Sequence, residues 1–190
     1  MVLHGGDNGQ LSAYGKSFKK HYIYDWKQHE LQTLISIGKV PGADKIPTLE
    51  EVLQLTLNSP NMLLNIEIKA PVDNKRSKAY NTDMAAEKVI ELIKKYDIGP
   101  RVVISSFTPK VIKSVEKASM PPEDRTFIIQ PLINVKGKTD PHNYVVQDHM
   151  SGLNMNYEFL NKERTSKVTK NKKLLGVWLS HKKTNKKENK

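Results

Sequence analysis

The sequence predicts an α/β fold in which parallel strands are joined by helical crossovers, hence a barrel or an open, doubly wound sheet. Short apolar runs rich in β-branched residues, such as 101–107 and 126–132, alternate with longer stretches whose apolar residues recur at helical spacing. The length of 190 residues suffices for one domain with a sizeable core. Because the chain has no cysteine, disulfides and thiolate sites are excluded, and oxygen or imidazole would bind any metal.

The first 38 residues carry weak structural signals. Residues 1–4 form a short apolar run that stops at a Gly-rich turn, as the end of a strand does, and residues 17–24 favour a weak strand or a loop. Asp25 is the expected N-cap of a helix that Gly38 ends.

The clearest local signal is a helix start. Thr48 and Glu51 have the spacing of a capping box and precede Leu and Val residues at helical spacing. The following run, 62–69, predicts a strand. Its period of two places the odd-numbered residues on one face: Leu63, Asn65, Glu67 and Lys69.

The rest of the chain continues the alternation. Asp83 is the expected N-cap of an amphipathic helix, 101–107 predicts a buried strand, and Pro109 takes the first position of the next helix. Three further strands are expected at 126–132, 152–156 and 173–179, with a polar helix over 157–171 before the last of them.

The net charge of +11 belongs to the end of the chain. Residues 162–190 contain 11 Lys or Arg and 2 Glu, which leaves a charge of only +2 for residues 1–161. We expect residues 181–190 to be a disordered basic tail, because a Lys/Asn-rich segment cannot bury apolar area. No apolar run approaches the roughly 20 residues of a membrane span, so a soluble, by default cytoplasmic, protein is expected.

The charged pair Glu67 and Lys69 admits two interpretations. A half-buried strand with a polar, solvent-facing side explains it without any function. The second interpretation is chemical, since the charges gather at the C-terminal end of the strand, where α/β barrels place their catalytic groups.

Five motifs together resemble the glycerophosphodiester phosphodiesterase family, in its order and spacing. They are His4-Gly5-Gly6-Asp7 after an apolar run, Ile46–Leu53, Leu64–Lys69, Ile104–Phe107 and Gly176–Trp178. The resemblance covers roughly residues 1–179, and 1–180 is expected to be the partial domain. It implies a TIM-type (β/α)8 barrel that is incomplete, lacking its first strands and its last.

The resemblance also implies a chemistry. The family hydrolyses glycerophosphodiesters to glycerol 3-phosphate and an alcohol, using a divalent cation and two histidines. Glu67 is similar to a metal ligand, Lys69 to a contact of the substrate phosphate, and His4 to the general acid that protonates the leaving alkoxide. Trp178 resembles a residue beside the substrate, although core packing explains it almost as well. Oxygen ligands without cysteine favour Ca²⁺ or Mg²⁺.

The chain departs from the family pattern at several points. The family begins with a His-Arg-Gly strand and a Glu-x-Asp pair that precede the region of His4, and this sequence contains neither. A lone Glu67 binds a divalent cation poorly, so very slow hydrolysis or none is expected of this N-terminally truncated chain. The alternative function is a non-catalytic basic protein that engages polyanions or an anionic membrane through its tail, without specific nucleic-acid recognition.

Overall fold

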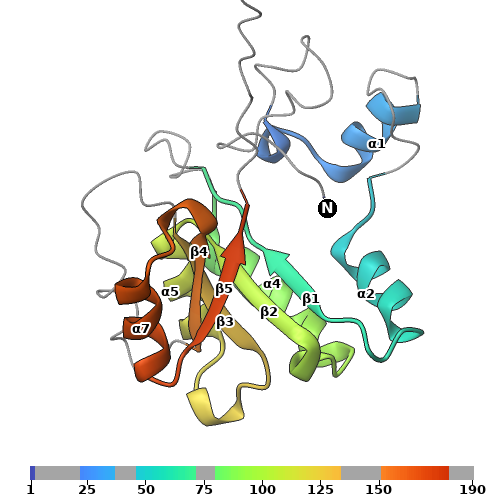
Figure 1. Cartoon of the computed structure of the whole chain (residues 1–190). Helices are drawn as coiled ribbons and strands as arrows, with labels where there is room; N and C mark the ends of the chain where they lie inside the picture. The colour runs from blue at the N-terminus through green and yellow to red at the C-terminus, as the bar shows by residue number, and fades with distance from the viewer. Residues whose placement is uncertain (3–21, 37–45, 72–79, 134–150, 180–190) are drawn as a thin grey trace, which may run out of the picture. The chain divides into compact units, whose positions relative to one another are not determined.

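The computed structural model of the protein describes residues 1–2, 22–36, 46–71, 80–133 and 151–179 (Figure 1). The chain divides into two compact units, Met1–Ile128 and Ile129–Lys190, which are described separately below. The expected basic tail lies outside the described residues, as do most of the weak N-terminal signals.

In the described part of the first unit, the first helical elements are a short 3-10 helix, Ile23–Asp25, and the helix α1, Gln28–Ser36. The prediction that Asp25 caps this helix is wrong, because Asp25 lies within the 3-10 turn. The Glu30 carboxylate instead accepts a hydrogen bond of 2.6 Å from the backbone N–H of Lys27. This bond is the carboxylate half of a capping box, in which the third residue of the helix accepts from the N–H of the residue before the helix.

The predicted capping box is confirmed at the start of α2, Leu49–Leu57. The Thr48 hydroxyl accepts from the Glu51 N–H at 3.1 Å, and the Glu51 carboxylate accepts from the Thr48 N–H at 2.8 Å. This helix buries Leu53 and Thr56.

The strand expected over 62–69 forms β1, Leu64–Glu67, and it pairs in parallel with β2, Val102–Ser106. In this register Glu67 lies opposite Ser105. The backbone N–H of Ile68 extends the ladder by one bond to the Ser105 carbonyl, 2.9 Å long. Helix α5, Pro109–Ala118, contacts β2 and packs beside α4, Thr82–Lys95 (Figure 1).

The cap of α4 differs from the prediction. Asn81, not Asp83, is the N-cap, and its side chain accepts from the Met84 N–H at 2.9 Å. Asp83 points to the neighbouring helix, where its carboxylate accepts a hydrogen bond of 2.5 Å from the Ser114 hydroxyl and lies 3.4 Å from the Lys117 ammonium. The Asp83 carboxylate therefore binds side chains of α5 and does not cap its own helix.

The described part of the second unit contains three parallel strands. They are β3, Ile128–Ile133, which begins at the boundary between the units, β4, Gly152–Asn156, and β5, Leu174–Trp178, with β4 between the other two. Between β4 and β5 the chain forms a 3-10 turn, Tyr157–Phe159, and then α7, Lys162–Lys170. The predicted polar helix is thus shorter than 157–171.

One side of β4 carries the core of this unit. Leu153 and Met155 pack with Val168 of α7, and Phe159 and Leu175 are packed against them. Residues 152, 154 and 156 point to the opposite side, as the period of two requires. The prediction of an α/β fold with parallel strands is confirmed in both units. No helix in the described part of the chain has the length and hydrophobicity of a membrane span.

Candidate functional site

The carboxyl end of β1 places two charged side chains on one face. Lys69 Nζ lies 3.4 Å from Glu67 Oε1, and the two side chains are 31% and 27% exposed. Lys69 lies two residues beyond the end of β1, but the bond from the Ile68 N–H to the Ser105 carbonyl continues the ladder past Glu67. Residues two apart in extended chain share a face, so this contact follows from the local sequence. The charges are therefore arranged at the edge of the sheet where parallel α/β folds place their reactive groups.

A hydrogen-bonded pair lies beside Glu67. The Ser105 hydroxyl, fully buried on β2, donates to Asn65 Oδ1 of β1 at 2.8 Å. This bond ties the two strands together directly next to the carboxylate, since Ser105 is the register partner of Glu67.

Ser106 has a structural role. Its hydroxyl donates to the Ile68 carbonyl at 2.6 Å and accepts from the Thr108 N–H at 3.1 Å, so it joins the end of β1 to the start of α5. The N-cap of α5 is Thr108, and the bond from its N–H to the Ser106 hydroxyl is that of a local serine turn.

A cavity of about 1000 Å³ runs along β1 within the first unit. Glu67 and Lys69 line it, together with Lys88 of α4 and the aromatic ring of Tyr80. The remaining walls are mostly apolar and come from α2, α4 and the N-terminal residues. Burial raises the pKa of the Tyr80 hydroxyl above its ordinary value, so this group stays neutral and can donate a hydrogen bond at neutral pH.

Metal ligands are sparse in the described residues. Within 1–2, 22–36, 46–71, 80–133 and 151–179 there is no group of three or more His, Asp or Glu side chains that could hold a metal. Glu67 is a single carboxylate and already has an ammonium neighbour, whereas hard divalent cations gather about 6 to 8 oxygen ligands. The donor set of the described residues does not fit the implied cation.

The second unit brings polar side chains to one side of its sheet. Trp178, the last residue of β5, is half-buried and lies opposite Asn156, the last residue of β4. Two residues earlier in each strand, and on the same face, Asn154 lies opposite Gly176. A Cβ at Gly176 would lie 2.9 Å from Asn154 Cγ and 3.1 Å from Gln130 Oε1, so the glycine makes room for both amides.

The structure places the predicted site residues unevenly. Glu67 and Lys69 are brought together, Trp178 lies at the carboxyl end of a strand in the other unit, and His4 lies outside the described residues. Sequence reasoning did not single out Asn154 and Asn156. The alternation of Asn with Leu and Met over 152–156 is the signal that marks them, because it gives the strand one polar side.

Comparison with known proteins relates the whole chain to one group. Residues 2–189 match the Glycerophosphoryl diester phosphodiesterase family. The glycerophosphodiester phosphodiesterase of Caldanaerobacter subterraneus subsp. tengcongensis is 30% identical over 117 residues, which are 62% of this chain and 44% of that protein. The glycerophosphodiester phosphodiesterase of Bacillus altitudinis is 39% identical over 91 residues, 46% of this chain and 34% of the relative. The chain therefore spans less than half the length of these curated relatives.

Solved structures of glycerophosphodiester phosphodiesterases have a fold similar to that of this chain. A Galdieria sulphuraria protein, named as a candidate glycerophosphodiester phosphodiesterase, superposes with a TM-score of 0.72 at 25% identity, over 94% of this chain and 65% of that one. A glycerophosphodiester phosphodiesterase from Parabacteroides distasonis shares the fold, with a TM-score of 0.59 at 20% identity over 87% of this chain and 61% of that one. The expectation of a partial TIM-type barrel is thereby confirmed at the level of the fold. The chain belongs to the glycerophosphoryl diester phosphodiesterase family.

Proposed function

We propose that this chain is a glycerophosphodiester phosphodiesterase-like protein that binds glycerophosphodiesters and hydrolyses them slowly to glycerol 3-phosphate and an alcohol. Family membership supports the substrate class. The observation that carries the proposal is the pair Glu67 and Lys69, which faces a cavity from the carboxyl end of a parallel strand.

Lys69 is the proposed contact of the substrate phosphate. A phosphodiester is an anion, and an ammonium aimed at its non-bridging oxygens lowers the cost of the charge that develops during attack by water. The Glu67 carboxylate, 3.4 Å away, holds this ammonium in place. On the family resemblance alone, Trp178 is proposed as a further substrate contact, and residues 1–180 are proposed to form the partial catalytic domain.

His4 is the proposed general acid. In hydrolysis the water oxygen forms the new bond to phosphorus and releases one proton to solvent, the ester P–O bond breaks, and the departing alkoxide takes up one proton. Imidazole titrates near neutral pH and can supply that proton. Slow turnover is proposed because, within the part of the chain that the structure describes, one carboxylate does not make the divalent-cation site that Ca²⁺ or Mg²⁺ would need.

The test is an assay of the 190-residue chain with glycerophosphocholine, with and without Mg²⁺ or Ca²⁺, measuring release of glycerol 3-phosphate. We expect turnover far below the roughly 1 to 1000 s⁻¹ of ordinary enzymes. Binding of glycerol 3-phosphate, measured by calorimetry, should weaken in Lys69→Gln and persist in Lys88→Gln, a second lysine of the same cavity. Metal-dependent release at an ordinary rate that disappears in Glu67→Ala would overturn the proposed slow turnover, and equal binding by both lysine variants would overturn the role of Lys69.

A further inference from the structure

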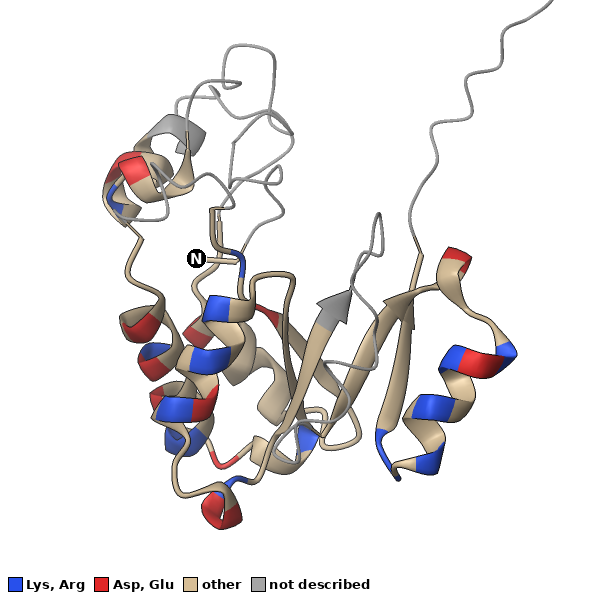
Figure 2. Cartoon of the chain, turned by 90° about the vertical axis from the view of Figure 1, so that its left-hand side faces the viewer, with Lys and Arg blue, Asp and Glu red and all other residues tan. Residues whose placement is uncertain are grey.

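The excess of basic over acidic residues in the described part of the chain is concentrated on α7 and the residues that follow it up to β5. The described part of the first unit contains 10 Lys or Arg and 12 Asp or Glu. By contrast, the segment from the start of α7 to the start of β5, residues 162–173, contains 6 Lys or Arg and 1 acidic residue. Figure 2 shows this difference as the succession of basic residues along α7.

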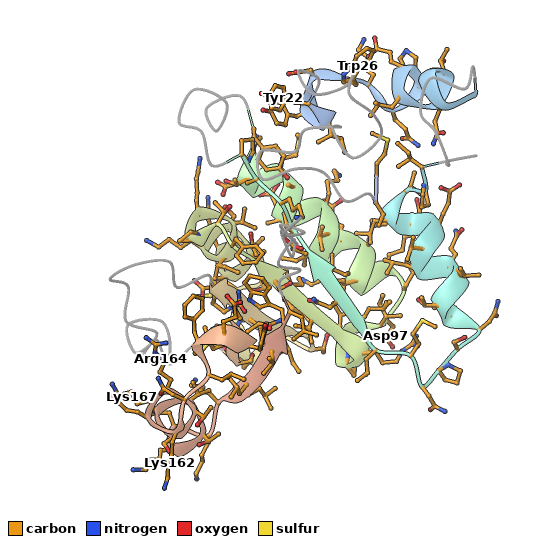
Figure 3. The ribbon with its side chains drawn as sticks, turned by 45° about the horizontal axis from the view of Figure 1, so that its top comes forward. Tyr22, Trp26, Asp97, Lys162, Arg164 and Lys167 are labelled. Carbon is orange, nitrogen blue, oxygen red and sulfur yellow. The ribbon has the colours of Figure 1, made fainter. Side chains whose placement is uncertain are left out.

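Most of these cations point away from the core. Val168 is the only residue of α7 that is buried. Lys162, Lys170 and Lys172 are exposed, and Lys167 retains 38% side-chain exposure although it lies 2.9 Å from the Glu163 carboxylate. Figure 3 shows the side chains of Lys162, Arg164 and Lys167 around the helix. Closely spaced like charges on a helix destabilise it, and an anionic partner would remove that repulsion.

Exposed apolar side chains flank the basic helix at both ends. Tyr157 and Leu160, just before α7, are 43% and 37% exposed, and Leu174, just after it, is 49% exposed. A helix with basic side chains and neighbouring Tyr and Leu is suited to lie on a lipid surface, with the cations at the headgroups and the apolar groups at the acyl boundary.

We propose that α7 and its flanking residues, 157–174, form a surface that binds anionic lipid membranes. A lipid surface is favoured over nucleic acid for two reasons. Five of the six cations are lysines, which interact as point charges, and the Arg164 guanidinium already donates to the Phe159 carbonyl at 3.0 Å. Nucleic-acid surfaces also use aromatic rings to stack bases, whereas two of the three exposed apolar side chains here are leucines.

The test is co-sedimentation of the full chain with two kinds of vesicle, one of phosphatidylcholine with about 30 mol% phosphatidylserine and one of pure phosphatidylcholine. The phosphatidylserine supplies the negative surface potential of a cytoplasmic leaflet. We expect binding to the anionic vesicles that falls with added salt. The variant Lys162→Gln/Lys167→Gln/Lys170→Gln should bind on the order of 100-fold more weakly, since each basic residue contributes about fivefold.

Two further variants keep the result interpretable. Lys94→Gln/Lys110→Gln/Lys113→Gln removes the same charge from exposed positions of α4 and α5 and should bind within about threefold of the wild type, because those residues lie outside the proposed surface. Lys162→Arg/Lys167→Arg/Lys170→Arg keeps the charge and should bind normally. The proposal is overturned if the chain does not bind anionic vesicles, or if the two triple Gln variants lose binding equally. It is also overturned if the triple Arg variant loses binding, or if α7 binds single-stranded RNA and not vesicles. None of these outcomes depends on hydrolysis of phosphodiesters.

Discussion

The Lys69 ammonium, two residues beyond the end of β1, lies 3.4 Å from the carboxylate of Glu67, the last residue of that strand. A divalent cation bound to Glu67 would have to share this carboxylate with a positive charge. Both side chains are about one-third exposed, so water weakens the repulsion without removing it.

Removal of Lys69 should therefore strengthen binding of Ca²⁺. We expect weak binding by the wild type and roughly fivefold tighter binding by Lys69→Gln, as measured by calorimetry. Glu67→Gln should bind no better than the wild type. Lys88→Gln is the control, because Lys88 lines the same cavity but pairs with Glu91 at 2.7 Å. Micromolar affinity in the wild type would contradict this account of the site.

The features that could be predicted from the sequence are those held by interactions between residues close together in the chain. The capping box of Thr48 and Glu51 spans three residues, and the contact between Glu67 and Lys69 spans two, so each follows from helix or strand periodicity alone. Asp83 was assigned to a cap for the same kind of reason. Its partner Ser114, however, lies 31 residues away on another helix, and no spacing in the sequence indicates it.

The same distinction applies to the candidate site. The bond between Ser105 and Asn65, which are 40 residues apart in the sequence, depends on the register of the two strands that carry them. Period-two alternation predicts which face of the sheet each side chain points to, but it does not predict which residue of the neighbouring strand lies beside it. The strand that carries Glu67 could be predicted, whereas the partly buried hydrogen bond beside it required the three-dimensional structure.

The acid stability of the first unit should depend on Asp83. The hydrogen bond from Ser114, reinforced by Lys117, holds the pKa of the Asp83 carboxyl below its ordinary value of 3.8. A lowered pKa in the folded state stabilises the protein at pH values above 3.8, and this contribution is lost as the pH falls through the lower, folded-state pKa.

Thermal melts of the wild type and Asp83→Asn should show this directly. We expect a higher Tm for the wild type at pH 6 and a difference that shrinks towards zero as the solution is acidified below the pKa of the folded state. In a Ser114→Ala background the difference at pH 6 should be smaller, because the main cause of the shift is absent. A difference that is constant over this pH range would contradict the assignment.

Loss of the capping box should destabilise α2. Thr48→Ala removes the acceptor of the Glu51 N–H, and such substitutions cost about 0.5 to 2 kcal/mol. Urea denaturation measures the change in the free energy of unfolding. Thr48→Ser retains the hydroxyl and should remain close to the wild type, so equal destabilisation by Ala and Ser would argue against the hydrogen bond as the cause.

Two glycines in the second unit should respond differently to the same added methyl group. A Cβ at Gly152 would overlap the carbonyl oxygen of Leu174 and lie 2.9 Å from its carbonyl carbon. That backbone cannot easily retreat, because the Leu174 N–H donates to the Ser151 carbonyl at 3.0 Å. At Gly176 the nearest atoms belong instead to the side chains of Asn154 and Gln130, which can rotate.

We therefore expect Gly152→Ala to reduce the free energy of unfolding by about 3 kcal/mol or more and Gly176→Ala by about 1 kcal/mol. Urea denaturation of the two variants gives the comparison. The double variant Asn154→Ala/Gly176→Ala should be less destabilised than the sum of its single changes, because Asn154→Ala removes the Cγ that lies 2.9 Å from the new methyl group. If Gly176→Ala proved the more harmful of the two, the paired strands β4 and β5 could not have the register in which Gly152 faces Leu174 and Asn154 faces Gly176.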